Sequence, residues 1–294
     1  MASNNFERYK ETVDSRIKEL LDLAEPGRTI GKAMRYSMTA GGKRLRPILN
    51  IMANSLFDGD TAETLDIACA IEMIHTYSLI HDDLPAMDDD ELRRGNPTCH
   101  VVFGEGIAVL AGDAFLNYAF ETMLANAERF PDNMPRHIKA MSIIAKAAGI
   151  FGMIGGQCSD LEAVDGDPDK HLLDYIHEHK TGAMIVGSLL SGAVLCNPGQ
   201  TEMDHLKRYG ECIGKAFQII DDILDIQGDP ALLGKTTGKD ADDNKLTFPK
   251  LYGISDSYKM ASDLTEEAVE CLDIFGTKAV DLAELAEKIL NRKK

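Results

Sequence analysis

The stretch IEMIHTYSLIHDDLPAMDDDELRRG, residues 71–95, joins an apolar helical segment to a dense cluster of acids. Six carboxylates fall within the ten residues from Asp82 to Glu91, and two arginines follow at once. Like charges repel, and an ionised carboxylate is costly to bury unless a cation pairs with it. We therefore expect this cluster to hold cations beside an apolar surface.

The rest of the chain shows the periodicity of amphipathic or buried helices. Apolar residues share a helical face in 6–21 and in roughly 44–57, 61–83, 105–128, 136–152, 171–196, 202–227, 256–273 and 276–291. No convincing alternating strand appears. Several segments are apolar nearly all round, which is typical of helices at the centre of a bundle. The sequence therefore predicts one all-α domain over 1–294, a bundle of about ten or more helices.

Charge and composition exclude several classes of function. A net charge of −17 argues against binding to nucleic acid and to an anionic membrane surface. The longest apolar run, 182–196, is too short and too interrupted to span a bilayer, and the N-terminus lacks an apolar signal core. The six cysteines are scattered without a CxxC pair, as in reduced proteins. We expect a cytoplasmic protein that contacts neither nucleic acids nor membranes.

A second acidic motif, DDILD, begins at Asp221 after the apolar residues AFQII. Asp221 and Asp225 are four apart and share one face of a helix. In the first motif Pro85 interrupts the helix, so Asp82 and Asp88 can turn to the same side. A solvated helix end would explain either motif alone. Two motifs of this kind favour Mg²⁺, which binds carboxylates, waters and phosphate oxygens.

Several basic segments accompany the acids. They are Lys43, Arg44 and Arg46 in GGKRLRP, the pair Arg93 and Arg94, Lys180 in HKTG, and Lys235, Lys239 and Lys245 in the loop predicted over 228–250. Amides at a helix start and guanidinium groups both bind phosphate. The spacing in LGKTTGK does not match a P-loop, which excludes an ATPase of that type. We expect Mg²⁺ and these cations to stabilise a leaving diphosphate, with apolar helices around a hydrocarbon tail.

The ordered set GGKRLRP, HDDLPAMDDDELRRG, GGQCSDL, HKTG, FQIIDDILD and GKTTGKD resembles the trans-isoprenyl diphosphate synthases, most like the bacterial farnesyl type. The resemblance implies a helical bundle around a central cavity, usually a homodimer, with roughly three Mg²⁺ ions when substrate is bound. It implies a head-to-tail condensation in which an allylic diphosphate, dimethylallyl or geranyl, ionises to a carbocation. The double bond of isopentenyl diphosphate attacks this cation, and a proton is lost to the released diphosphate.

The same resemblance implies a role for each site residue. The direct metal ligands would be Asp82, Asp88 and Asp221, supported by Asp83, Asp222 and Asp225. The allylic diphosphate would be bound by Arg93, Lys180, Lys235 and Lys245. Isopentenyl diphosphate would be bound by Lys43, Arg46, His75 and Arg94, although a lone histidine on an apolar helix is otherwise a core residue. The catalytic residues would be Lys180, Thr181 and Gln218, of which Thr181 and Gln218 face the developing cation. A supporting polar shell would come from Gln157 and Asp160.

Product length is expected to depend on Tyr77, five residues before Asp82. In the family a bulky aromatic residue near this position forms the floor of the cavity and stops growth at fifteen carbons. The resemblance therefore favours farnesyl diphosphate, with geranylgeranyl diphosphate as the alternative product. Plain core packing is the other interpretation of Tyr77.

Three other classes of protein compete with this interpretation. A di-iron bundle would use the Glu-x-x-His pairs Glu72–His75 and Glu202–His205, but it would leave both aspartate motifs unexplained. A terpene cyclase would share the first aspartate motif without needing DDILD or GGKRLRP. A non-catalytic partner subunit would not be expected to keep both acidic motifs intact.

Overall fold

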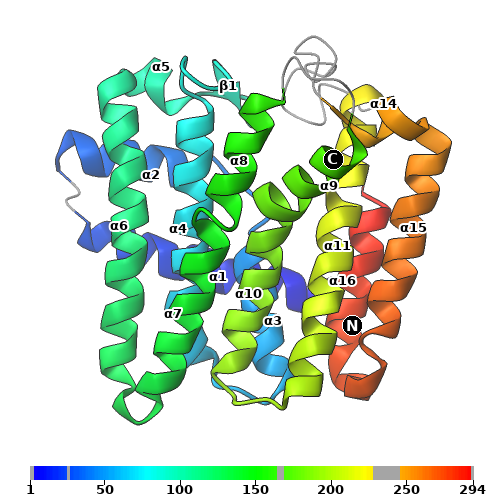
Figure 1. The fold of residues 1–294 in the computed structure, drawn as a ribbon. Helices are drawn as coiled ribbons and strands as arrows, with labels where there is room; N and C mark the ends of the chain where they lie inside the picture. The colour runs from blue at the N-terminus through cyan, green and yellow to red at the C-terminus, as the bar shows by residue number, and fades with distance from the viewer. Residues whose placement is uncertain (1–2, 25–26, 164–168, 228–245, 293–294) are drawn as a thin grey trace.

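Helices make up nearly all of the chain in the computed structural model, which describes residues 3–24, 27–163, 169–227 and 246–292 (Figure 1). The α-helices are α1 (Ser3–Leu23), α2 (Thr29–Thr39), α3 (Leu45–Leu56), α4 (Thr61–Asp82), α5 (Cys99–Phe103), α6 (Glu105–Arg129), α7 (Met134–Ala148), α8 (Met153–Glu162), α9 (Lys170–Ile176), α10 (Ala183–Val194), α11 (Gln200–Gln227), α14 (Phe248–Tyr252), α15 (Ile254–Glu270) and α16 (Val280–Leu290). Shorter elements are the 3₁₀ turns η1 (Pro131–Asn133) and η3 (Asp273–Ala279), the π-helix η2 (His177–Gly182), and the strands β1 (Leu92–Arg93) and β2 (Asn96–Pro97). The predicted all-α class is confirmed.

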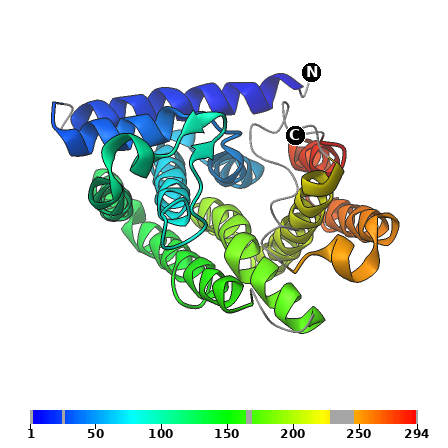
Figure 2. The ribbon, with the colours of Figure 1, turned by 90° about the horizontal axis from the view of Figure 1, so that it is seen from above.

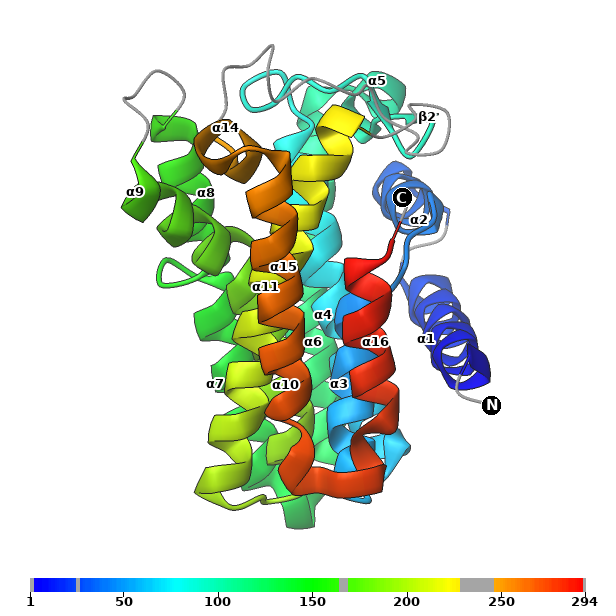
Figure 3. The same ribbon diagram turned by 90° about the vertical axis from the view of Figure 1, so that its right-hand side faces the viewer.

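The long helices stand side by side around α4 and α10, while α1 and α2 cross them on one side (Figures 2 and 3). Helix α4 packs against α3 and α6, and α10 packs against α3, α7 and α11. Both were predicted to be central because they are apolar nearly all round, and their side chains are indeed largely buried. The core thus surrounds α4 and α10. The C-terminal end of α4 adjoins the first acidic motif, and the N-terminal end of α10 follows the basic motif HKTG.

Helix α4 ends where the first acidic motif begins. Asp60 starts the helix, since its side chain accepts a hydrogen bond from the backbone N–H of Ala62. Pro85 prevents the helix from continuing, and the chain turns back so that the Asp88 amide donates to the carbonyl of Asp82, with N and O 2.9 Å apart. The chain therefore turns back at Asp88, as the prediction that both carboxylates face one way requires.

The C-terminal ends of α4 and α11, which carry the two aspartate motifs, lie at the same end of the bundle (Figures 1 and 3). The β1–β2 hairpin follows the first motif and pairs Leu92 with Pro97 and Arg93 with Asn96. Residues 228–245, which follow the second motif, lie outside the described part of the chain. The fold therefore brings both acidic clusters to one end of the molecule.

Several predicted boundaries were wrong. The single helix expected over 171–196 contains the π-helix η2, and the helix expected over 136–152 ends at Ala148, before Gly149. Within the predicted loop 228–250, Phe248 begins the short helix α14, with Pro249 at a first-turn position that a proline favours. Three short helices, α2, α5 and α8, were not predicted.

Two segments, Glu105–Arg129 and Pro131–Glu162, are long and apolar enough to cross a membrane by length and composition alone. The second segment is divided between α7 and α8, and helices of a buried core pass the same test. All six cysteines lie in the described part of the chain as free thiols; Cys69, Cys99 and Cys212 are buried, whereas Cys158 is exposed.

Candidate active site

A cavity of about 520 Å³ opens beside the end of α4. One part of its wall is polar and carries Asp82, Lys180 and Arg46, while Leu116 and Met153 belong to its apolar part. The cavity is therefore suited to a molecule with a charged head and a hydrocarbon tail. Other predicted site residues in the same wall are His75, Tyr77, Gln157 and Thr181.

Asp82 is the carboxylate of the first motif that faces this cavity. Desolvation is the main reason why the pKa of Asp82 is raised to about 6; Lys180 opposes the rise, and Asp88 contributes to it. A buried carboxylate that remains so costly to ionise gains from any cation that binds it. The all-oxygen donor set of the motif fits a hard divalent ion.

Asp83 takes a different position from its neighbour. Its side chain is buried and accepts a hydrogen bond from Arg93, with Oδ1 2.6 Å from Nε. Burial raises the pKa of Asp83, and the Arg93 guanidinium opposes that rise. Asp83 therefore anchors Arg93, one of the residues expected to bind the allylic diphosphate.

The π-helix η2 places Lys180 and Thr181 beside the cavity. Lys180 Nζ lies 2.6 Å from Asp160 Oδ2, and Thr181 Oγ1 donates to Gln218 Oε1 over 3.1 Å. A π turn is uncommon and is often found where side chains must be re-aimed at a functional site. The structure thus brings together the predicted catalytic residues Lys180, Thr181 and Gln218.

Gln218 connects η2 to the second aspartate motif. Its amide nitrogen donates to Asp222 Oδ1 over 3.1 Å, and the backbone N–H of Phe248 donates to Asp222 Oδ2 over 3.0 Å. Asp222 is buried, as is Asp225 one turn later. Asp222 therefore ties α11 to the start of α14.

Asp221, the first residue of that motif, accepts a hydrogen bond from Arg292 near the C-terminus, with Oδ1 3.1 Å from Nη2. The Arg292 guanidinium also donates to the carbonyl of Phe217 over 2.7 Å and lies 3.9 Å from the centre of its ring. The role of the basic C-terminus could not be predicted from the sequence, because this contact joins residues 71 apart along the chain.

Of the four residues expected to bind isopentenyl diphosphate, two line the same cavity as Asp82. Arg46 and His75 both line the cavity, and Arg94 donates to the carbonyl of Gly41 in the loop before α3. Arg46 Nε has no hydrogen-bond partner among the described residues. Desolvation and then Arg46 hold the pKa of His75 well below its usual value, so the ring is neutral at pH 7. Arg46 is half-buried, and its Nε finds no acceptor among the described residues while Glu72 is paired with Arg44, which is consistent with an anionic ligand.

The described residues do not place every predicted ligand. Lys235 and Lys245 lie in the undescribed stretch 228–245. Within the described ranges no three His, Cys, Asp or Glu side chains converge tightly enough to hold a metal by themselves. A diphosphate bridging the two motifs would supply the missing oxygen ligands.

The di-iron alternative is not supported by the geometry. Glu72 is paired with Arg44, and Glu202 accepts the backbone N–H of Gly199 at the start of α11. His205 lies against the carbonyl of Cys271 rather than near His75. The two Glu-x-x-His pairs therefore serve separate structural contacts.

Sequence reasoning missed three positioning contacts. It quoted Asp160 and GGQCSDL without predicting the ion pair to Lys180 or the contact of Gly156 with η2. It grouped Arg44 with the cations expected to bind phosphate, whereas the structure pairs Arg44 with Glu72, a residue that the sequence placed only in a rival protein class. Each contact joins residues far apart in sequence, and no local periodicity reveals such a pair.

Comparison with known proteins agrees with this site. The family model for polyprenyl synthetases matches residues 28–283. A geranylgeranyl diphosphate synthase of Cyanophora paradoxa is 44% identical over 289 residues, which cover 98% of this chain and 95% of that protein. A dimethylallyltranstransferase of Fischerella ambigua is 43% identical over 284 residues, covering 96% and 81% of the two chains.

Solved structures show the same architecture over the whole chain. An FPP/GFPP synthase from Zymomonas mobilis superposes with a TM-score of 0.87 at 36% identity, covering 99% of this chain and 100% of that one. A geranyltransferase from Legionella pneumophila gives a TM-score of 0.88 at 33% identity, covering 99% and 98%. The chain therefore belongs to the polyprenyl synthetase family and is a prenyltransferase with the helical bundle of the isoprenoid synthases.

Proposed function

We propose that this prenyltransferase makes farnesyl diphosphate by head-to-tail condensation of isopentenyl diphosphate with dimethylallyl or geranyl diphosphate. The observation that carries the proposal is Tyr77 in the cavity wall, five residues before Asp82 on α4. Five residues of helix correspond to about 7.5 Å along the axis, so the ring lies deeper than the acidic end. A chain growing away from Asp82 would meet this ring.

The packing of Tyr77 supports a fixed barrier. Its side chain is 6% exposed, its ring lies edge-on to His81 with centroids 5.8 Å apart, and His81 in turn contacts the carbonyl of Val109. Its hydroxyl has no hydrogen-bond partner among the described residues. Burial, and then Asp82, raise the pKa of Tyr77 to about 12, so the phenol stays neutral. The burial of the side chain and its edge-on contact with His81 restrict rotation of the ring.

Geranylgeranyl diphosphate is the second candidate product, with the same chemistry and one more condensation. It is favoured by the names of the relatives, since proteins of Cyanophora paradoxa and Arabidopsis thaliana at 44% and 46% identity are called geranylgeranyl diphosphate or pyrophosphate synthases. The distinction rests on cavity depth alone, which makes Tyr77 the residue to test.

The two aspartate motifs would hold roughly three Mg²⁺ ions together with the diphosphate, through Asp82, Asp88 and Asp221. Bound Mg²⁺ would stabilise the negative charge that develops on the leaving diphosphate. The anchored residues Asp83 and Asp222 would support this arrangement by fixing Arg93 and Gln218. Asp225 would act beside them. Asp221 would need to exchange or share its contact with Arg292 when it binds an ion.

The remaining residues would bind and orient the two substrates. The allylic diphosphate would be bound by Arg93, Lys180, Lys235 and Lys245. Thr181 and Gln218, which already share a hydrogen bond, would direct oxygen dipoles toward the cation formed when the C–O bond breaks. The isopentenyl double bond then forms the new C–C bond, and a proton passes to the released diphosphate. The diphosphate of isopentenyl diphosphate would be bound by Lys43, Arg46, His75 and Arg94.

Replacing Tyr77 with alanine is expected to shift the main product from fifteen to twenty carbons or more. The change removes the aromatic ring from the cavity wall, and the space becomes available to the growing chain. Labelled isopentenyl diphosphate, each allylic primer and Mg²⁺ are incubated with the enzyme, and the hydrolysed products are sized by chromatography. Tyr77→Phe keeps the ring and should leave product length unchanged. A wild-type product of twenty carbons, or an unaltered distribution in Tyr77→Ala, would contradict the farnesyl assignment.

We further propose that the active enzyme is a homodimer formed through α5 and α6. Val102, Leu110 and Leu124 are exposed on these helices, at 45%, 54% and 56%, which is unusual for a free surface of a soluble bundle. Light scattering at micromolar concentration should give twice the mass of the chain. Leu110→Asp with Leu124→Asp should give a monomer, whereas a monomeric wild-type protein would refute the proposal.

A further inference from the structure

The loop before α3 has a left-handed backbone that suits its two glycines but not Arg44. Gly41 and Gly42 have φ values of 97° and 144°, and Arg44 has φ 51°. A left-handed conformation costs a residue with a side chain about 1–2 kcal/mol. Arg44 occupies the N-cap position of α3 without a side-chain capping hydrogen bond, so its contacts elsewhere must compensate for this cost.

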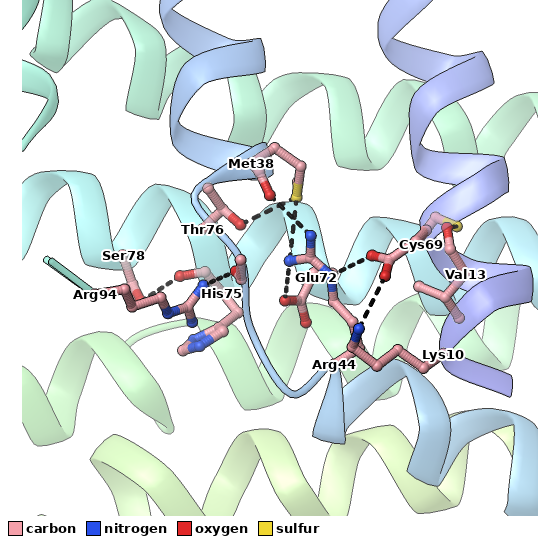
Figure 4. A network of polar contacts seen from close by, with 12 residues as sticks. Lys10, Val13, Met38, Arg44, Cys69, Glu72, His75, Thr76, Ser78 and Arg94 are labelled. Carbon is pink, nitrogen blue, oxygen red and sulfur yellow. Dashed lines mark hydrogen bonds and ion pairs between the residues drawn. The ribbon is translucent and has the colours of Figure 1, made fainter. Parts of the chain in front are cut away.

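Arg44 makes contacts to three other helices at once (Figure 4). Its Nε donates to Asp14 Oδ1 of α1, its Nη1 to Glu72 Oε1 of α4, and its Nη2 to the carbonyl of Met38 in α2, each over 2.8 Å. Every guanidinium nitrogen is engaged, and the side chain is only 6% exposed. Arg44 is therefore held behind the cavity wall and cannot itself bind a substrate.

One neighbour of Arg44 reaches the cavity. Lys43 precedes it in the loop, and Arg46 lies in the first turn of α3 and lines the cavity. Glu72 is three residues before His75, so the two side chains leave α4 on one face. The Arg44–Glu72 contact thus sets the start of α3 against the part of α4 that carries His75.

Glu72 also supplies negative charge to this group of cations. It is 2% exposed, and it raises the pKa of Arg46, opposing the effects of desolvation and of Arg94. Arg94 holds the loop from the other side, through the carbonyl of Gly41. Removing the charge of Glu72 would leave Arg44, Arg46 and Arg94 to repel one another in a poorly solvated site.

We propose that Arg44 and its buried counter-ion Glu72 form a positioning pair that holds Lys43 and Arg46 in place for the diphosphate of isopentenyl diphosphate. The pair acts through these neighbours and contacts no substrate. The proposal rests on the proposed function, since it deepens the description of that same site.

The test is steady-state kinetics of Glu72→Gln, Arg44→Lys, Arg44→Met and the double variant, with each substrate varied in turn. Glu72→Gln keeps the shape of the side chain and removes its charge, and Arg44→Lys keeps the charge but cannot reach three acceptors. We expect KM for isopentenyl diphosphate to rise at least about 10-fold in Arg44→Met and less in Arg44→Lys. We expect kcat and the KM of the allylic primer to change less than about 3-fold. The double variant should be no worse than Arg44→Met alone.

A matched control is the ion pair of Arg208 with Glu267, whose nitrogen and oxygen lie 2.7 Å apart on an exposed face. Arg208→Met and Glu267→Gln should leave both KM values unchanged. Thermal melts separate loss of folding from loss of binding, and Asp14→Asn offers a milder change if Arg44→Met does not fold, since Asp14 is 39% exposed. A parallel rise in both KM values, or a fall in kcat alone, would overturn the proposal.

Failure of the proposed function has a different signature. A wild-type protein with no turnover on any primer would refute the prenyl condensation itself. Calorimetric titration with inorganic pyrophosphate would then decide the role of Arg44. Weaker binding in Arg44→Met and Glu72→Gln than in the wild-type protein supports the positioning pair, and equal binding refutes it.

Discussion

Asp82→Asn is expected to lower kcat by about 10³-fold while leaving the protein folded. Asp82 is the carboxylate of the first motif that faces the cavity. An amide can still accept a hydrogen bond, but it carries no charge to hold Mg²⁺ beside the leaving diphosphate. The loss should fall on kcat because the developing charge on the diphosphate is greatest in the transition state.

The same substitution is expected to stabilise the metal-free protein at pH 7. Burial raises the pKa of Asp82 from 3.8 to about 6, so the folded protein keeps this proton at pH values where the unfolded chain has lost it. Stability contributed by Asp82 is therefore highest below pH 4 and falls as the pH rises to 6. The gain from Asp82→Asn is at most about 3 kcal/mol at pH 7 and vanishes near pH 4.

Both effects can be measured on one pair of variants. Urea unfolding with chelator at pH 7 and pH 4 gives the stability difference, and turnover with excess Mg²⁺ gives kcat. Asp89→Asn is the matched control, because Asp89 lies in the same acidic cluster, is exposed, and has a φ of 50° that asparagine tolerates. A normal kcat in Asp82→Asn would show that Asp82 does not hold the metal. A lower stability of Asp82→Asn than of the wild-type protein at pH 7 would show that the charge of Asp82 is already compensated.

The sequence could predict the parts of this protein that depend on local pattern. The apolar residues of 61–82 and 183–194 are spread around the helix and leave no continuous polar stripe for solvent, which identifies central helices. Pro85 identifies the end of α4 and explains why Asp88 returns to Asp82. A motif that ends an apolar helix is thus predictable in both its position and its chemistry.

The contacts that aim the side chains could not be predicted in this way. The π-helix η2 shifts the hydrogen-bond register at Lys180 without altering the apolar periodicity over 171–196. The Arg44–Glu72 pair joins residues 28 apart in sequence, and the Asp221–Arg292 contact joins residues 71 apart. These pairings depend on tertiary packing, and a single sequence contains no record of it.

Gly156→Ala is expected to test how closely η2 must be held for catalysis. A Cβ at Gly156 would lie 2.2 Å from the backbone nitrogen of Lys180 and 2.8 Å from the carbonyl carbon of His179. These are backbone atoms that cannot rotate away, so α8 and η2 must move apart. The ion pair of Lys180 with Asp160, one turn further along α8, would be distorted by the same movement.

A displacement of about 1 Å in a catalytic group can cost roughly 10²-fold in rate, and we expect kcat to fall by about that factor. The overpacked contact should also cost about 1–3 kcal/mol of stability, seen as a lower midpoint in urea. Gly106→Ala is the matched control, because a Cβ there meets no atom within 4 Å, and alanine in α6 should be neutral or slightly stabilising. Unchanged kcat in a destabilised Gly156→Ala protein would mean that the position of η2 is not critical. If kcat falls by more than the unfolded fraction of the Gly156→Ala protein accounts for, the role of Gly156 is to keep Lys180 and Thr181 at the reaction site.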